Sequence, residues 1–149
     1  MLSATVEMLG VPLQMAERSD LFAAPRHANM ALRRREIPAG PGVYTWFKNA
    51  ECVYIGVATS LRSRLSTHRR QTADLSRSTL RASVAVMLFG VTRARARSRP
   101  SVMTPGEIAA VNAWFTDTEV AWIESATADD ARVLERSLLE NRLPPLNLK

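Results

Sequence analysis

The chain has 149 residues, of which 46% are hydrophobic and 23% charged, a composition typical of a globular domain rather than of a disordered chain. Its twenty basic residues, eighteen of them arginine, outnumber fourteen acidic residues, so the formal net charge is +6. No apolar run approaches the roughly 20 residues that span a bilayer, and no basic segment precedes an apolar run at the N-terminus. A single cysteine, Cys52, excludes an internal disulfide framework and a zinc site with several thiolates. We therefore expect a cytoplasmic protein.

The first part of the chain, residues 1–38, has little patterning and is expected to form an N-terminal extension. Residues 38–41 (PAGP) prevent a helix and mark a boundary, so residues 39–149 are predicted to form the main domain. Residues 42–47 (GVYTWF) and 52–56 (CVYIG) are short runs rich in β-branched and aromatic residues. Two strands this close in sequence indicate a β-hairpin at the start of the domain.

Four helices and a third strand are predicted after the hairpin, from capping residues and hydrophobic spacing. Ser60 and Thr127 are suitable N-cap residues, and Thr104 pairs with Glu107 in a capping box. Between the second and third helices, residues 93–99 (RARARSR) are expected to form a flexible basic loop. This order predicts an α+β fold in which a small three-stranded antiparallel sheet is flanked by helices. The helices are predicted over residues 61–71, 76–89, 104–115 and 127–141, and the third strand over residues 119–124.

The positive charge is concentrated between residues 61 and 99. This stretch holds ten arginines and a single acid, Asp74, for a local charge of +9. Such a stretch is often only a solvated surface, but arginine also binds phosphate oxygens through two parallel hydrogen bonds. The charge distribution therefore favours a nucleic acid as the partner.

A few residues have the chemistry of a phosphodiester-cleaving site. The only two tyrosines, Tyr44 and Tyr54, lie in the two strands of the predicted hairpin. Arg64 and His68 are four residues apart, which places them on one face of the first predicted helix. Glu135 lies in the middle of the last predicted helix. Taken singly, each residue also fits a packing or surface role.

Together, these residues resemble the GIY-YIG nuclease superfamily, which includes homing endonucleases and the N-terminal domain of a bacterial nucleotide-excision-repair incision subunit. Residues 42–44 (GVY) match the first motif with valine in place of isoleucine, and residues 54–56 (YIG) match the second motif unchanged. Glu135 resembles the metal-binding glutamate of the family, and residues 144–147 (PPLN) resemble its closing Pro-x-x-Asn segment. The resemblance spans residues 41–148. Residues 76–81 (SRSTLR), followed by an apolar run, also resemble a compact bacterial branch of the superfamily.

This resemblance implies a metal-dependent endonuclease that hydrolyses DNA, with a role in DNA repair. Tyr44 or Tyr54 would act as general base, Arg64 would bind the scissile phosphate, and His68 would support the phenolate. Glu135 would hold one Mg²⁺ or Mn²⁺ ion, because a single carboxylate suits a cation that keeps several waters. Which tyrosine is the base stays open at this point.

Five further residues are expected to contact the substrate. Two alternatives are compatible with the same sequence: a non-catalytic nucleic-acid-binding module of this fold, and an RNA nuclease, since phosphate and metal chemistry is common to both nucleic acids. The chain has few residues for a separate DNA-recognition domain, which leaves recruitment by a protein partner open. The expected substrate contacts are Gly56, Arg62, Arg69, Arg70 and Asn147.

Overall fold

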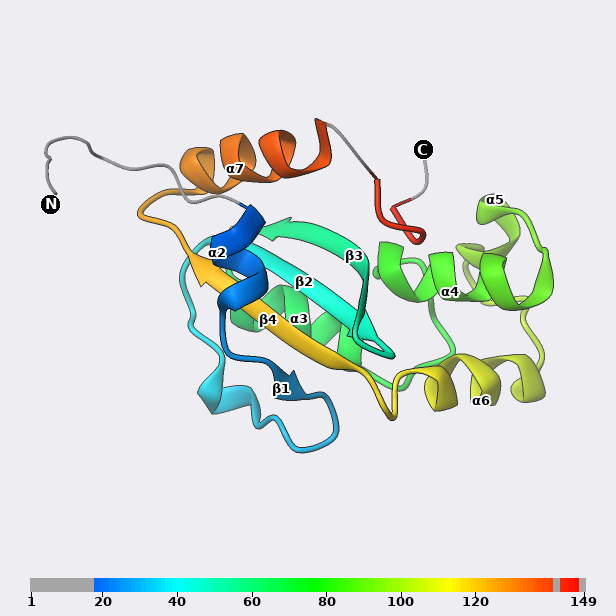
Figure 1. The fold of residues 1–149 in the computed structure, drawn as a ribbon. Coiled ribbons are helices and arrows are strands. Elements are labelled where there is room, and N and C mark those ends of the chain that lie inside the picture. Colours follow the sequence, from blue (N-terminus) through cyan, green and yellow to red (C-terminus); the bar gives the residue numbers. More distant parts are fainter. Residues whose placement is uncertain (1–17, 141–142, 148–149) are drawn as a thin grey trace, which may run out of the picture.

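A four-stranded antiparallel sheet forms the centre of the molecule, in the strand order β1-β4-β2-β3 (Figure 1). The computed structural model describes residues 18–140 and 143–147. The predicted α+β class with helices flanking an antiparallel sheet is confirmed. The strands are β1 (His27–Ala28), β2 (Gly42–Lys48), β3 (Glu51–Ala58) and β4 (Glu119–Glu124).

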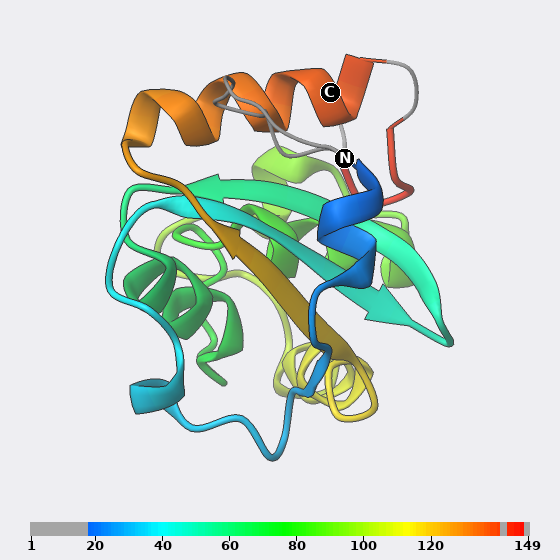
Figure 2. The same cartoon turned by 60° about the vertical axis from the view of Figure 1, so that its left-hand side comes forward.

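Helices cover both faces of this sheet. α2 and α7 lie on one face, whereas α3 lies against the other, with α4 and α6 beside it (Figure 1, Figure 2). Each layer has its own hydrophobic core. None of the helices in the described residues is long and apolar enough to cross a membrane. The helices are α2 (Arg18–Ala23), the 3-10 helix η1 (Arg34–Glu36), α3 (Leu61–Arg69), α4 (Thr79–Phe89), α5 (Arg93–Ala96), α6 (Pro105–Trp114) and α7 (Ala128–Glu140).

The expectation of three strands is wrong, because β1 adds a fourth. His27 of β1 pairs with Val120 of β4, and a side-chain ring stack joins His27 to Trp122 of the same strand. A strand of two residues is too short to show an alternating pattern, so sequence reasoning did not find it. It is held in place by the strand beside it rather than by its own propensity.

The hairpin of β2 and β3 forms as predicted. Its two turn residues, Asn49 and Ala50, both have positive φ angles of 52° and 65°, as a two-residue type I′ turn requires. At the other end of β2, a Cβ on Gly42 would lie 2.4 Å from the carbonyl oxygen of Ile123 and 2.7 Å from Cδ1 of Leu61. Glycine is therefore required for β4 and α3 to approach β2 this closely.

Two helix predictions need correction. Residues 93–99 do not form a flexible loop throughout, because α5 occupies their first half, with the Thr92 side chain capping it through the Arg95 N–H. α4 begins at Thr79 rather than at residue 76. The hydroxyl of Ser78 accepts the backbone N–H of Arg81 and thereby fixes the helix start.

The described part of the predicted extension, residues 18–38, packs against the rest of the molecule. Leu21 of α2 and Ile37 after η1 are fully buried. Arg62 of α3 donates to the Ile37 carbonyl at 2.9 Å, and Arg69 donates to Asn29 at the same distance. Helix α3 is therefore joined to this segment by side chains along its length.

Candidate active site

Three buried side chains from three elements form a hydrogen-bonded chain. The Tyr44 hydroxyl, from the central strand β2, lies 2.6 Å from Nε2 of His68 on α3. The other ring nitrogen of His68, Nδ1, lies 2.7 Å from the hydroxyl of Ser78 before α4. Tyr44 and His68 are 2% and 0% exposed. We refer to Ser78, His68 and Tyr44 as the buried triad.

The protonation state of His68 decides which groups donate and which accept in the hydrogen bonds of the buried triad. Burial lowers the pKa of His68 to about 3, and the positive charges of Arg64 and Arg81 contribute to the same shift. The imidazole is therefore neutral near pH 7. When Nδ1–H donates to Ser78, Nε2 carries a lone pair that accepts the Tyr44 O–H. In this tautomer the hydrogen bonds run from the Tyr44 hydroxyl to His68 and from His68 to the Ser78 hydroxyl.

Gly56 makes the room that Tyr44 needs. The two residues are direct partners across β2 and β3, and a Cβ on Gly56 would lie 2.3 Å from the Tyr44 hydroxyl oxygen. Any larger residue at position 56 would push the phenol away from His68. This gives the glycine of the second motif a packing reason, and substrate contact by Gly56 stays a prediction.

Tyr54 lies beside the buried triad on the same face of the sheet. Its ring centroid is 6.2 Å from that of Tyr44 and 6.0 Å from that of His68. Its hydroxyl lies 2.7 Å from Oγ1 of Thr79, the first residue of α4. With 9% of its surface exposed, Tyr54 is more accessible than Tyr44.

The pKa of Tyr44 records which charges reach its hydroxyl. Burial raises this pKa well above its usual value, and the neighbouring Tyr54 adds to the rise. The guanidinium of Arg64 opposes the shift, whereas the carboxylate of Glu135 reinforces it. The five residues that were predicted to be catalytic are related through Tyr44, because Tyr54 and His68 lie against its ring and the charges of Arg64 and Glu135 act on its hydroxyl. We refer to Tyr44, Tyr54, Arg64, His68 and Glu135 as the cluster.

Arg64 is an exposed cation on the wall of an open cavity of about 350 Å³. The cavity lies between α3 and the start of α7, and Ser60, Ser63 and Arg132 are among its lining residues. Among the described residues, the guanidinium of Arg64 has no hydrogen-bond or ion-pair partner. Its charge is therefore free to bind an anion in this cavity.

Glu135 belongs to α7, the helix on the opposite face of the sheet from α3, and its charge acts on the Tyr44 hydroxyl. Its side chain is half-buried, and this burial raises its pKa, an effect that the charge of Arg136 partly opposes. Within residues 18–140 and 143–147 the carboxylate has no hydrogen-bond or ion-pair partner. A carboxylate that has lost water without gaining a partner is suited to a cation.

The residues present fit a single divalent ion held by one carboxylate. No group of three or more histidine, cysteine, aspartate or glutamate side chains occurs in the described part of the chain. His68 is not available as a ligand, because both its nitrogens are engaged in the buried triad. One carboxylate with open surroundings is the donor set expected for Mg²⁺ or Mn²⁺, which takes its other ligands from water and phosphate.

Three of the residues predicted to contact the substrate form hydrogen bonds to other parts of the protein. Arg62 and Arg69 bond to the segment before β2, as described above. The Asn147 side chain accepts the N–H of Ile55 at 2.9 Å and donates to its carbonyl oxygen at 2.7 Å. Since β3 is the edge strand, Asn147 replaces part of a missing strand partner. Of the five predicted contacts, Arg70 is exposed at the end of α3.

Sequence reasoning did not identify the partners that position the catalytic side chains. Ser78 and Thr79 bond to His68 and Tyr54, respectively. They lie in residues 76–81, a stretch that resembles a compact bacterial branch of the superfamily, but this resemblance assigned them no role. The only available signal was that serine is favoured at a helix N-cap. That signal places the start of α4 and does not show that the capping hydroxyl also binds a histidine.

Comparisons with known proteins found a family model and several solved structures that match this chain. A family model described as GIY-YIG catalytic domain matches residues 42–149. Among solved structures, two tyrosine-to-phenylalanine mutants of the GIY-YIG N-terminal endonuclease domain of UvrC from Thermotoga maritima are similar to the chain, at 20% and 19% identity. Each match covers 78% of this chain and 96% of that domain, with a TM-score of 0.43, and both mutants are bound to a catalytic divalent cation. No match is found among curated proteins.

Proposed function

The chain belongs to the GIY-YIG catalytic-domain family of nucleases, and on that premise we propose that it is a divalent-metal-dependent endonuclease that hydrolyses phosphodiester bonds in DNA. The observation that carries the proposal is the cluster itself. A buried phenol is bonded to a neutral histidine and is acted on by the charges of an arginine and a carboxylate that have no partner in the described part of the chain. These are the groups that phosphodiester hydrolysis needs: a base, a phosphate ligand and a metal ligand.

Arg64 binds the scissile phosphate in this proposal. Its planar guanidinium can donate two parallel hydrogen bonds to phosphoryl oxygens, and it lines an open cavity without any protein partner. Negative charge on these oxygens grows as water attacks, so a fixed cation stabilises the transition state more than the ground state. Because Arg64 is exposed, its substitution should weaken phosphate binding with little effect on the stability of the fold.

A tyrosine removes a proton from the attacking water. An ordinary phenol is a weak base at neutral pH because it is protonated, so it must pass its own proton on as it receives another. Tyr44 has an acceptor for that proton in Nε2 of His68, at 2.6 Å, once the negative charge of the bound phosphate offsets the burial and arginine charges that lower the pKa of His68 to about 3. Tyr54 bonds to the Thr79 hydroxyl and is more exposed. We therefore assign the base to Tyr44, with the ring of Tyr54 beside it.

Glu135 holds the single metal ion, Mg²⁺ or Mn²⁺. When bound, this ion supplies positive charge that neutralises the phosphate and the departing oxygen. The half-buried carboxylate itself supplies one hard oxygen ligand, and the ion would take its other ligands from water and phosphate. Without the ion, its negative charge raises the pKa of Tyr44 and opposes formation of the phenolate.

The test is cleavage of supercoiled plasmid DNA by the purified chain, with Mg²⁺, with Mn²⁺ and with an excess of chelator. Nicked and linear products that appear only with metal support the proposal. A structured RNA assayed in parallel decides between DNA and RNA as the substrate. Tight binding of DNA with no cleavage under any condition would favour a non-catalytic binding module of the same fold.

A further inference from the structure

A second cavity, of about 420 Å³, lies where the end of α3 meets α4 and α6. At about 100° per residue, Ser66 and Arg70 lie roughly 200° and 240° around α3 from Arg64, so this cavity opens on a different side of the helix from the catalytic cavity. We call it the arginine pocket and define it by six of its lining residues: Arg34, Ser66, Arg69, Arg70, Arg81 and Asn112.

The wall of the arginine pocket contains two buried polar atoms that have no partner. Arg81 is only 1% exposed, and its Nη2 donates to the Thr72 carbonyl at 3.1 Å and to Oδ1 of Asn112 at 2.6 Å. Its Nε has no hydrogen-bond partner among the described residues, and neither has the hydroxyl of Ser66. Buried donors are almost always satisfied in native proteins, so a ligand or a water molecule is expected here.

The charged residues that line the pocket are all positive. Four arginines line it, and its lining residues include no aspartate or glutamate. Burial lowers the pKa of Arg81 to about 10, which reflects the cost of holding this guanidinium away from water. A buried cation without a counter-ion is unfavourable, and an anion in the cavity would relieve that cost.

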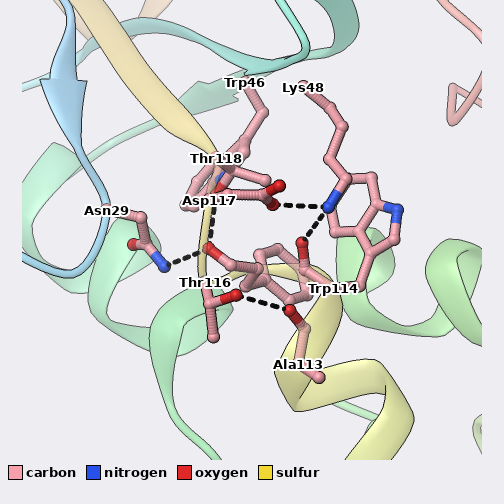
Figure 3. Close-up of polar contacts among 9 residues, drawn as sticks. Asn29, Trp46, Lys48, Ala113, Trp114, Thr116, Asp117 and Thr118 are labelled. Atoms are coloured by element: carbon pink, nitrogen blue, oxygen red, sulfur yellow. Dashed lines mark hydrogen bonds and ion pairs between the residues drawn. The ribbon is translucent and has the colours of Figure 1, made fainter.

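The walls are held in position before any ligand arrives. Arg69 donates from Nε to Oδ1 of Asn29 at 2.9 Å, and Asn29 in turn donates to the Phe115 carbonyl at 3.1 Å. Figure 3 shows the Asn29 side chain turned toward the segment that holds Thr116 and Thr118. These bonds connect α3, the segment after β1 and the end of α6. A pocket fixed in this way loses little conformational freedom on binding, which favours affinity for a small anion.

We propose that the arginine pocket binds a phosphate group, separately from the catalytic cavity. The exposed Arg34 and Arg70 donate at the rim of the cavity. Arg81 Nε–H and Ser66 O–H lie behind the wall with almost no exposed surface, and a small outward turn of these side chains brings them to the phosphate. A tetrahedral phosphate offers oxygens in several directions, as donors on different walls require. The group comes either from the backbone of a nucleic acid, which rests on the proposed function, or from a small phosphate-bearing molecule, which does not.

The experiment follows the Nε–H signal of Arg81 in a ¹H–¹⁵N NMR spectrum of the full chain. Inorganic phosphate is titrated against chloride at constant ionic strength, with chelator present so that catalysis plays no part. We expect a saturable shift of this signal. Ser66→Ala removes one donor and Arg70→Gln removes one rim charge, and each should weaken phosphate binding about tenfold. Arg95→Gln, an equal charge change on α5, is the matched control and should leave it unchanged.

The outcomes separate the possibilities. If the Arg81 signal does not respond to phosphate, or responds equally in all variants, the inference is overturned and the buried donors are satisfied by water. If phosphate saturates the Arg81 signal equally in the wild type and in Arg95→Gln, and binds about tenfold more weakly to Ser66→Ala and to Arg70→Gln, the pocket is a phosphate site. Displacement by a DNA oligonucleotide without terminal phosphates then identifies the backbone as the source, and lack of displacement identifies a small molecule. Plasmid cleavage measured in parallel tests the proposed function independently.

Discussion

Replacing Tyr44 by phenylalanine removes a single hydroxyl from the buried triad and keeps the ring. The lost hydrogen bond is 2.6 Å long and joins two side chains that are almost fully buried, so no water replaces it. Nε2 of His68 is then left without a partner, which costs about 1–3 kcal/mol of folding free energy. For a chain of this length, each kcal/mol corresponds to roughly 2–4 °C in Tm. Tyr54→Phe is the control, because its hydroxyl is nearer solvent and should cost about 1 kcal/mol or less.

The assay pairs urea denaturation with plasmid cleavage at a temperature where every variant is folded. If Tyr44 is the general base, its turnover falls on the order of 10²-fold or more, far beyond what its lost stability explains. The double variant with His68→Leu should cost less than the sum of the two single changes, since both members of the bond are then gone. A Tyr44→Phe protein as stable as the wild type would refute the buried triad. Full turnover in both Phe variants would refute a tyrosine base.

Three further predictions concern His68, Arg64 and Asn147. The pKa of His68 is about 3 in the folded chain against an ordinary 6.5, so the unfolded chain takes up a proton first as pH falls. The free energy of unfolding therefore keeps this contribution above pH 6.5 and loses it toward pH 3, at about 1.4 kcal/mol per pH unit. In urea titrations at several pH values, His68→Gln should make the free energy of unfolding depend less on pH over this range, and an unchanged pH dependence would contradict the prediction. Arg64→Lys keeps the charge but loses the planar fork, so cleavage should fall at least tenfold with stability within about 0.5 kcal/mol of wild type, and equal cleavage would exclude bidentate phosphate binding. Asn147→Ala should cost about 1–3 kcal/mol by leaving the Ile55 backbone unpaired, and an unchanged denaturation midpoint would contradict that role.

Much of the catalytic cluster could be predicted because its residues occupy regular elements. The alternation of a strand puts Tyr44 and Trp46 on one face of β2, and the period of a helix puts Arg64 and His68 on one side of α3. The fold class follows from the same periodicities. Glu135 was placed on its helix by pattern, but the effect of its charge on Tyr44 depends on how α7 crosses the sheet, which no local pattern encodes.

The residues whose roles could not be predicted are those whose partners lie in irregular segments. Arg62 and Arg69 read as surface cations that would bind a substrate, yet backbone carbonyls and an amide from residues 29–37 hold them. Arg81 reads as one more residue of a basic stretch, although it is buried. A charged side chain has the same appearance in sequence whether it faces solvent or a carbonyl, so only tertiary structure distinguishes the two.

The central claim is that Glu135 holds the cation that hydrolysis requires, and Glu135→Gln tests it most directly. Burial raises the pKa of Glu135, so its carboxylate destabilises the folded chain at neutral pH, and the glutamine variant should be at least as stable as the wild type. Plasmid cleavage is measured for both proteins over a range of Mg²⁺ concentrations. The account predicts that the glutamine variant binds DNA as tightly but cleaves at background rate at every concentration. Cleavage by this folded variant at the wild-type rate would contradict the account.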